Sequence, residues 1–462
     1  MEKAIIPISR GEEIDLYISG ITHSGNGVGR VQGIAVFVPG VVPGDKVRAE
    51  VAELKKNYAV ARLLEITVPS AFRRDPECPR FSGCGGCRLQ NVDYQEQVRL
   101  KTTLVKDSLS RIAGLDGTVV REAIGMADPR HYRNKAHFQI EYRSGVFSLG
   151  FYQEGTHTLS AFFGGEDTSG CLLVDRDINI MALTIEKLLN RYGKSAEAKK
   201  SRFFRHVVIR KGFYTGELMV VLVTESGEWP AQTGFVREIL SGNKLTSLIR
   251  NINSGSPGII MGRENMVLAG QGHITDRLGD LSFIISPSSF YQVNPAQTKV
   301  LYGKALEYAD LGPDRDKTVV DAYSGVGTIA LFMAGSAQKI YALEVVPGSV
   351  EDARRNAAIN SVNNIEFLAG EAEKLLPSLT AQGLRLDVAV LDPPRRGCHP
   401  DVLEALANIE VPRIVYVSCD PGTLARDLSR LTDRGYRVEE VQPVDMFPWT
   451  QHVECVAKIG RR

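Results

Sequence analysis

Residues 319–330 read VVDAYSGVGTIA, and this stretch decides the fold of the C-terminal half of the chain. An apolar, β-branched run is typical of a buried strand, and the two glycines after it stand just before a second apolar segment. Gly325 and Gly327 would let the backbone approach a bound small molecule closely. Strand-like segments then alternate with helical ones as far as residue 459. We therefore expect a doubly wound, Rossmann-like α/β domain with a ligand at this turn.

Glu344 bears on the class of that ligand. It ends the next strand-like segment, YALEVV, about 20 residues after the turn, where a carboxylate can accept hydrogen bonds from both hydroxyls of a ribose. Dinucleotide enzymes use a third glycine to seat a pyrophosphate at the helix N-terminus, and Ala330 stands at that position here. S-adenosylmethionine carries no phosphate and suits the shorter turn. The pattern favours a methyltransferase, with a dehydrogenase as the alternative.

Three polar residues are expected at the same edge of the sheet. Asp392 in LDPPRRG ends the fourth strand, and Cys419 follows the fifth strand, RIVYVS, just before a helix. A helix N-terminus can lower the pKa of a thiol below its usual ~8.5, which makes Cys419 a candidate nucleophile. Glu454, in DMFPWTQHVECVAKI, is a candidate general base. The alternatives are a local cap for Asp392, a space-filling thiol for Cys419, and the polar member of an alternating strand for Glu454.

The first 285 residues differ in character from the rest. Residues 9–68 contain short β-branched runs between glycine-rich turns, which predicts a small barrel resembling an oligonucleotide-binding (OB) fold. Residues 91–113 have apolar positions at helical spacing, and from 130 to 285 strands and helices are mixed. The expected fold class is multidomain α/β: a barrel (9–68), a central α+β domain with a cysteine cluster (75–90 and 122–284), and a methyltransferase domain (91–121 and 285–462).

Three cysteines lie close together in ECPRFSGCGGC, at Cys78, Cys84 and Cys87. The chain has seven cysteines, and an odd number argues against a disulfide framework. Metal binding, catalysis and plain burial are the competing interpretations of the cysteines, and if they bind a metal the spacing alone slightly favours structural zinc. Cys398 and Cys455 lack such a context, and we expect both to be packing residues.

The composition of the 462 residues sets few limits. Hydrophobic residues make up 43% and charged residues 24%, which is typical of a globular protein. No apolar run reaches the roughly 20 residues needed to span a bilayer, so we expect no membrane contact and, by default, a cytoplasmic location. The net charge of +1, from 55 basic and 54 acidic residues, neither predicts nor excludes a nucleic-acid partner.

Five motifs in order resemble one family. FYQVNPAQ (290–297), DAYSGVGT (321–328), LDPPR (391–395), VYVSCDPGTLARDL (415–428) and MFPWTQHVE (446–454) resemble the S-adenosylmethionine-dependent RNA uracil-5 methyltransferases. More narrowly, they resemble the ribosomal RNA branch that carries an iron–sulphur cluster, and the 9–68 barrel resembles the TRAM domain of that family. The resemblance covers essentially the whole chain. Ser324 replaces a cysteine that is often found in the cofactor turn.

The resemblance implies a role for each matching position. Cys419 would be the nucleophile and Glu454 the base that removes the C5 proton of uracil, with Asp392 nearest the nucleobase. Gln292, Tyr323, Glu344 and Asp392, with the turn glycines, would line the cofactor and uracil sites. Phe290 and Asn294 would shape the pocket, and Phe290 would face the RNA.

The resemblance also implies a [4Fe–4S] cluster, because Cys171 in SGCLLV would join the three clustered cysteines as a fourth ligand. It favours 23S ribosomal RNA with a flipped-out uridine as substrate, with transfer RNA as the alternative and no protein partner required. The expected RNA contacts include Arg133 and Lys135 in HYRNKAHF, where Tyr132 and Phe138 would stack on bases. Residues 191–211 hold eight basic residues against one acidic, and Lys55, Lys56 and Tyr58 of the barrel could add contacts.

Three other functions compete with uracil-5 methylation as interpretations of the sequence. Cytosine-5 methyltransferases carry a second cysteine after the DxP loop, where this chain has Pro394 and Arg395. Amino-group methyltransferases prefer an aromatic residue after their two prolines, which Arg395 does not satisfy. A non-catalytic, RNA-binding iron–sulphur factor with a retained methyltransferase fold is the rival from another class, and it would not need Cys419 or Glu454.

Overall fold

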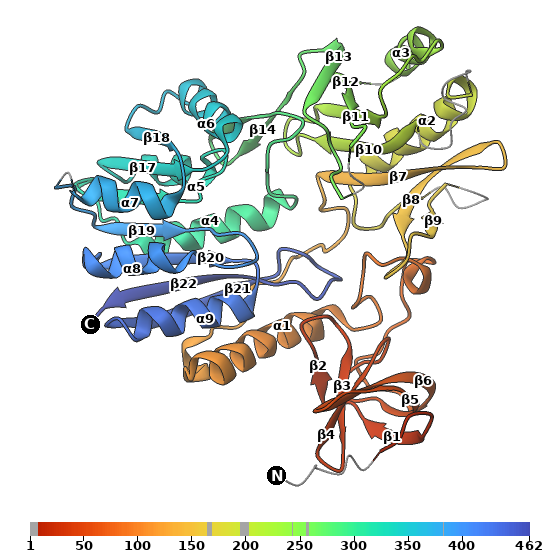
Figure 1. The fold of residues 1–462 in the computed structure, drawn as a ribbon, viewed down its shortest axis with the longest axis horizontal. Helices are drawn as coiled ribbons and strands as arrows, with labels where there is room; N and C mark the ends of the chain where they lie inside the picture. The colour runs from red at the N-terminus through yellow and green to blue at the C-terminus, as the bar shows by residue number, and fades with distance from the viewer. Residues whose placement is uncertain (1–7, 164–168, 195–202, 243, 256–257, 382) are drawn as a thin grey trace.

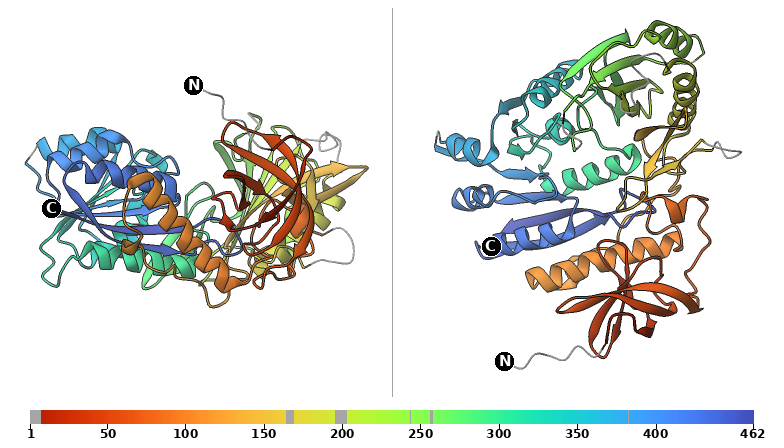
Figure 2. Two further views of the ribbon diagram at one scale, coloured as in Figure 1. Left: turned by 90° about the horizontal axis from the view of Figure 1, so that it is seen from below. Right: turned by 45° about the vertical axis from the view of Figure 1, so that its right-hand side comes forward.

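The computed structural model describes residues 8–163, 169–194, 203–242, 244–255, 258–381 and 383–462. They form three bodies: a red barrel, a yellow and green sheet with helices, and a teal to blue α/β unit (Figure 1). Two further views show the same three bodies from other sides (Figure 2). Within the described ranges, no helix is both long and apolar enough to cross a bilayer.

The N-terminal sheet closes on itself. Its strand order is β1-β5-β6-β4-β3-β2. Its strands are β1 (Glu13–Tyr17), β2 (Gly20–Ile21), β3 (Gly27–Val31), β4 (Ile34–Val38), β5 (Lys46–Leu54) and β6 (Tyr58–Val68). The chain runs from β1, which pairs with β5 at one edge, almost directly into β2, which pairs with β3 at the other edge. Alternate side chains, such as Ile14 and Leu16, point into the enclosed core.

The central unit is a seven-stranded sheet in the order β13-β12-β11-β10-β7-β8-β9. The strands are β7 (Lys135–Arg143), β8 (Val146–Tyr152), β9 (Leu159–Ala161), β10 (Phe204–Lys211), β11 (Leu218–Thr224), β12 (Ser247–Ile252) and β13 (Glu264–Gly270). Helices α2 (Arg176–Tyr192) and α3 (Gln232–Ser241) pack on one face and share an apolar core with it. Every second residue of β7, including Ala136 and Phe138, points into that core.

The C-terminal sheet has the order β18-β17-β16-β19-β20-β22-β21. Its strands are β16 (Thr318–Ala322), β17 (Lys339–Glu344), β18 (Ile365–Ala369), β19 (Val388–Leu391), β20 (Arg413–Ser418), β21 (Tyr436–Val444) and β22 (Glu454–Arg461). The first five strands are parallel, and β22 runs antiparallel between β20 and β21. Both faces are covered, and accordingly the inner strands are continuous apolar runs rather than alternating ones.

Helices cover the two faces of this sheet in separate layers. Helices α4 (Pro295–Ala309), α5 (Thr328–Ala334) and α6 (Pro347–Ile359) share one core with it. Helices α7 (Ala372–Ala381), α8 (Pro400–Asn408) and α9 (Pro421–Thr432) share the other. The hairpin of β14 (Ile274–Leu278) and β15 (Leu281–Ile285) packs against α6. This is the doubly wound arrangement predicted from the glycine turn.

An upstream segment completes the α/β unit. Helix α1 (Tyr94–Ser108) is capped by Asp93, continues into the π-helical turn η2 (Leu109–Ala113), and packs against α9 and β21. The 3-10 turns η1 (Phe81–Gly83) and η3 (Gly117–Val119) lie before and after it. On α1, Lys101 is fully buried, and its ammonium group lies 2.5 Å from Oδ1 of Asp445. A helix from the first quarter of the chain therefore supports a loop close to residue 450.

Candidate functional site

A cavity of about 660 Å³ opens at the carboxyl ends of the parallel strands, where an open α/β sheet binds its ligands. Strands β16 and β19 are neighbours there, and the chain leaves them toward opposite edges of the sheet. The wall comes from the loops after the parallel strands, from the β21–β22 loop and from the segment before α4. Of the residues predicted from the sequence, it includes Phe290, Gln292, Tyr323, Gly325, Glu344, Asp392, Cys419 and Glu454.

Glu344 holds the glycine turn in place. Its Oε2 accepts a hydrogen bond from the backbone N–H of Gly325 at 2.9 Å, and its Oε1 accepts one from Val346 at 2.8 Å. Each carboxylate oxygen keeps a second lone pair that can accept from a ligand hydroxyl. Tyr323 and Gly325 both have positive φ values, +68° and +56°, so the chain turns sharply at the end of β16. The carboxylate and the turn therefore form one prebuilt wall.

Gly327 was expected to contact the cofactor, but it does not line the cavity. It caps α5 with a φ of +78°, and a Cβ there would lie 3.0 Å from the ring of Phe367 and 3.2 Å from Cβ of Ala353. A glycine is therefore needed at position 327, because a side chain there would hinder the close packing of α5. Ser324, by contrast, does line the cavity, and its buried Oγ has no hydrogen-bond partner among the residues that the structure describes. That hydroxyl is a polar group that a bound ligand can satisfy.

Two carboxyl groups and a thiol meet at the other end of the cavity. Burial raises the pKa of Asp392 to about 7. Burial, together with the charge of Asp392, raises the pKa of Glu454 to about 8. Burial, with the nearby carboxylates of Glu454 and Asp392, raises the pKa of Cys419 to about 12. We had expected the start of α9 to lower the thiol pKa, and this was wrong, because desolvation and two negative neighbours outweigh the helix terminus.

Arg395 and His452 also line this end of the cavity. The guanidinium group of Arg395 opposes the increase in pKa at both Cys419 and Glu454, so it is the positive charge that faces the reactive groups. Burial and the same guanidinium lower the pKa of His452 to about 4, which leaves a neutral imidazole at pH 7. The sequence motifs alone assign Arg395 no place in the site. Its position one residue after the two prolines of the Asp392 loop could have indicated its place here.

The FYQVNPAQ motif serves both the cavity and the packing beneath it. Phe290 is 67% exposed at the mouth, and Gln292 lies on the wall. Asn294 was expected to shape the pocket, but it is fully buried below it. Its Oδ1 caps α4 by accepting from the N–H of Gln297, and its Nδ2 donates to the carbonyl of Met446 at 2.9 Å. Asn294 therefore ties α4 to the β21–β22 loop.

Cys78, Cys84, Cys87 and Cys171 line a second cavity of about 400 Å³. All four are free thiols, and burial raises the pKa of Cys87 to about 12 and that of Cys171 to about 11. Gln90 Nε2 donates to Sγ of Cys87 at 3.3 Å. In the part of the chain that the structure describes, no three Cys, His, Asp or Glu side chains form a group that could hold a metal ion. The finding for the four thiols is therefore that they share the wall of one cavity.

Comparison with known proteins identifies the family. The family profile described as tRNA (Uracil-5-)-methyltransferase matches residues 93–462, and the TRAM domain profile matches residues 8–64. The chain belongs to the tRNA (uracil-5-)-methyltransferase family. The uracil-5 methyltransferase resemblance, the TRAM domain and the mixed α/β class are confirmed. The protein is thus an S-adenosylmethionine-dependent RNA methyltransferase.

Relatives of this uracil-5 methyltransferase match it over nearly their full length. An uncharacterized RNA methyltransferase of Oceanobacillus iheyensis is 43% identical and covers 99% of both chains. One from Bacillus cereus is 42% identical and covers 98% of both chains. The crystal structure of the Pyrococcus abyssi tRNA (uracil-54, C5)-methyltransferase in complex with S-adenosyl-L-homocysteine is 27% identical, with a TM-score of 0.74, over 96% of this chain and 99% of that one.

The aromatic residues of HYRNKAHF are not on the surface of this methyltransferase, where contact with RNA bases was expected. Tyr132 and Phe138 are buried, at 2% and 0% exposure, so the expectation that they stack on RNA bases was wrong. They belong to the alternate positions that pack inward. Arg133 and Lys135 point the other way and line the cysteine cavity. Their contact with RNA stays a prediction.

The other expected RNA contacts have mixed outcomes. Within 191–211, residues 195–202 lie outside the described part of the chain, and Phe203 and Phe204 are buried in the central core, where they cannot stack on a base. On the barrel, Lys55 and Lys56 are exposed, and Tyr58 is 37% exposed. Cys398 and Cys455 are buried, as expected for packing residues.

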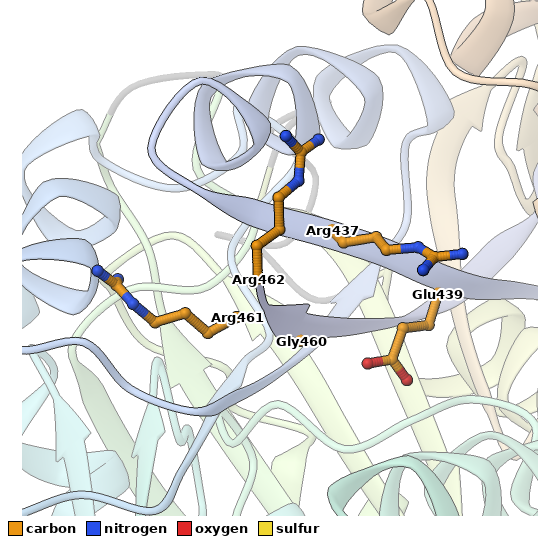
Figure 3. A pocket seen from close by; sticks show the side chains of 5 residues that line it. All are labelled: Arg437, Glu439, Gly460, Arg461 and Arg462. Atoms are coloured by element: carbon orange, nitrogen blue, oxygen red, sulfur yellow. The ribbon is translucent and has the colours of Figure 1, made fainter.

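A third hollow of the methyltransferase domain lies at the opposite end of the sheet. It is lined by Arg437, Glu439, Gly460, Arg461 and Arg462. Figure 3 shows that the three guanidinium groups point in different directions. Side chains that diverge in this way do not form a site for one anion, so we assign this hollow no role in the reaction.

Proposed function

We propose that the protein transfers a methyl group from S-adenosylmethionine to C5 of a specific uridine in RNA through a covalent bond between Cys419 and C6 of the uracil. The observation that carries this proposal is the single cavity that holds Cys419, Asp392 and Glu454 at one end and the Glu344 turn at the other. A donor at the turn and a nucleobase at the thiol would then share one enclosed space, which is what a direct transfer requires.

The walls of the cavity fit the methyl donor. Glu344 can accept from ribose hydroxyls, and Ser324 offers a buried hydroxyl to which no other described residue is hydrogen-bonded. Tyr323, Gly325 and Gln292 complete the surface around the donor. When bound, the donor supplies an electrophilic methyl group on a positively charged sulphur. The protein's part is to hold it still and to exclude water.

Carbon 5 of uracil is a weak nucleophile, and Cys419 activates it. The thiol proton moves to a carboxylate of the same cavity, and the S–C6 bond forms as the C5=C6 electron pair shifts toward C5 and O4. C5 would take the methyl group as the sulphur–methyl bond of the donor breaks and its electron pair stays on sulphur, and the Glu454 carboxylate would then remove the C5 proton. The S–C6 bond then breaks, which restores the double bond and returns the thiolate. Asp392 and Gln292 orient the polar edge of the base.

The elevated pKa values give this sequence of steps a physical basis. A thiol with a pKa of about 12 is protonated at pH 7 and needs a base, and two carboxyl groups with pKa values of about 7 and 8 can exchange protons near that pH. Because the three groups lie close together, the protonation of each one depends on the charge of the other two. The charge of Arg395 favours the thiolate and the carboxylate.

The uridine must leave its stack to reach Cys419, which costs about a few kcal/mol and is least costly in single-stranded loops. The exposed ring of Phe290 at the mouth can stack on a base and offset part of this cost. We assign the barrel (9–68) and the central domain (75–90 and 122–284) to RNA binding around the methyltransferase domain (91–121 and 285–462). Arg133 and Lys135 would contribute from the central domain.

A trapping experiment tests the chemistry. RNA with 5-fluorouridine at the target carries no C5 proton for Glu454 to remove, so the Cys419 adduct should accumulate in the presence of the donor. We expect a protein–RNA band that survives denaturation and is lost in Cys419→Ala, whereas the packing variant Cys398→Ala retains it. Absence of both adduct and methyl transfer with every RNA would overturn the proposal and favour a non-catalytic RNA-binding factor.

We further propose that Cys78, Cys84, Cys87 and Cys171 hold a [4Fe–4S] cluster. Four free thiols around one cavity support it, because a cluster has a volume of its own, whereas a single zinc ion needs its four sulphurs about 2.3 Å from one point. Protein purified without oxygen should contain iron and sulphide. Cys171→Ser and Cys84→Ser should reduce the iron content equally, and Cys398→Ser should not. Stoichiometric zinc in place of iron would refute the cluster.

For the substrate we propose 23S ribosomal RNA, supported by the resemblance of the cysteine segment to the ribosomal RNA branch. Transfer RNA is the second candidate, because the Pyrococcus abyssi protein of similar fold is a tRNA (uracil-54, C5)-methyltransferase. The purified protein should be given both RNAs from cells that lack it, and 5-methyluridine should be mapped in each. Methylation of transfer RNA alone would overturn the ribosomal assignment.

A further inference from the structure

The loop between β21 and β22, residues 445–453, lies between the two cavities. Phe447 and His452 line the cavity that holds Cys419, called the reaction cavity below. The loop leads directly into Glu454 at the start of β22. In Figure 1 this blue loop extends from the sheet toward the orange part of the chain. Its conformation therefore decides where Glu454 points.

The cysteine segment, residues 78–89, is hydrogen-bonded to this loop through its backbone. The N–H groups of Arg88 and Leu89, directly after Cys87, both donate to the carbonyl oxygen of Trp449, at 3.1 and 3.0 Å. Trp449 has a φ of +67°, a conformation that a bulky residue adopts only when its surroundings impose it. The two hydrogen bonds provide part of that constraint.

The indole of Trp449 adds to this constraint, and so does Gln97 of α1, whose Oε1 accepts from the backbone N–H of Trp449 at 3.2 Å. Trp449 is 9% exposed and forms one apolar cluster with Tyr132 and Leu173, against which Cys87 and Cys171 pack. Its Nε1 donates to the carbonyl of Pro129 at 2.9 Å. Two of the four cavity cysteines therefore belong to the packing of the tryptophan that bends the loop.

Arg133 makes a second connection between the two cavities. It lines the cysteine cavity, and its guanidinium carbon lies 5.8 Å from the ring centroids of both Tyr132 and Phe447. Phe447 is a wall residue of the reaction cavity. On its other side the loop is held by α1, where Lys101 donates to Asp445 and to the carbonyl of Phe447. The loop is therefore supported from two sides. The contacts of Trp449 involve the cysteine segment, whereas those of Lys101 do not.

We propose that Trp449 is a positioning residue through which the cysteine segment sets the conformation of the 445–453 loop and hence the placement of Glu454. This inference rests on the proposed function for the role of Glu454 in the reaction. It gives the cysteine site a defined effect on catalysis without any part in the chemistry. Disorder at the cysteines would loosen the loop while the donor site at Glu344 stays intact.

Hydrogen exchange of the full-length protein, without RNA or donor, tests the coupling directly. In Trp449→Ala the amides of residues 446–453, and those of Arg88 and Leu89, should exchange about tenfold faster than in the wild type. Cys171→Ala should have a similar effect on the loop. Trp449→Phe, which keeps an aromatic ring in the cluster, should stay near the wild type, and Cys398→Ala should leave the loop unchanged.

Enzyme assays supply the second measurement. Trp449→Ala should lower kcat about tenfold or more with little change in the KM for RNA, and Trp449→Phe should restore most of it. Loop exchange within about twofold of the wild type in both Trp449→Ala and Cys171→Ala would overturn the proposal. If Trp449→Ala does not fold, Trp449→Phe and Cys171→Ala carry the test. Should the wild type methylate no RNA while the exchange coupling holds, the proposed function fails and the coupling stands.

Discussion

Replacing Lys101 by methionine should weaken the methyltransferase domain more than any surface change. Both members of the Lys101–Asp445 pair are fully buried, and Asp445 Oδ2 also accepts from the Tyr94 hydroxyl at 2.9 Å. Lys101→Met leaves a carboxylate without its countercharge and removes one of the donors to the carbonyl of Phe447, which Thr450 still contacts. Removing one partner of a buried ion pair costs about 3–5 kcal/mol. At about 2–4 °C per kcal/mol for a unit of about 200 residues, its midpoint should fall by about 6–20 °C.

Thermal unfolding followed by circular dichroism checks this value against two further variants. Arg355→Ala breaks an ion pair with Glu351, whose side chains are 55% and 68% exposed, and a longer one of 3.8 Å with Asp352, and it should change stability by less than about 1 kcal/mol. The double variant Lys101→Met/Asp445→Asn removes the stranded charge and should recover at least about half of the loss. A Lys101→Met midpoint equal to that of Arg355→Ala, or no recovery in the double variant, would refute the reasoning.

Three further predictions concern the reaction cavity. Because Glu454, with a pKa raised to about 8, must be ionised to accept the C5 proton, single-turnover release of that proton, followed as tritium from RNA labelled at C5 of uridine, should slow about tenfold per pH unit below pH 8, and a flat profile from pH 6 to 9 would exclude it as the base. Glu344→Ala should raise the Kd for S-adenosylhomocysteine, measured by calorimetry, about 10- to 150-fold. This is the effect of losing a charged hydrogen bond of about 1.5–3 kcal/mol. Unchanged affinity would show that Glu344 does not belong to the donor site. Phe290→Ala should raise the KM for RNA about 5- to 150-fold through lost stacking, with an unchanged melting temperature because the ring is 67% exposed, and an unchanged KM would contradict the stacking role.

Most of the reaction cavity could be predicted from the sequence because its parts are local. In a parallel sheet every strand ends at the same edge, so Asp392 and Cys419 meet once their strands are recognised. The same argument placed Glu344 beside the glycine turn, 19 positions from Gly325. Glu454 followed from a last strand that returns to this edge.

What could not be predicted depends on distant contacts and on solvent exclusion. The direction of the Cys419 pKa shift depends on burial by loops far along the chain and on how closely Asp392 and Glu454 approach the thiol, and the sequence specifies neither. The buried position of Tyr132 and Phe138 did have a signal, since alternate residues of a strand face opposite sides. Aromatic and basic residues that alternate in HYRNKAHF cannot both face the RNA.

The support of the 445–453 loop by α1 has a consequence for how the molecule assembles. Lys101 and Asp445 are separated by 344 positions, whereas the donor turn closes over 19. The entropic penalty of closing a loop grows only with the logarithm of its length, but contacts between remote parts of a chain slow folding. The Glu344 turn can therefore take shape early, whereas the 445–453 loop beside Glu454 is completed late. A partly folded chain would have its glycine turn in place before the opposite wall of the cavity is closed.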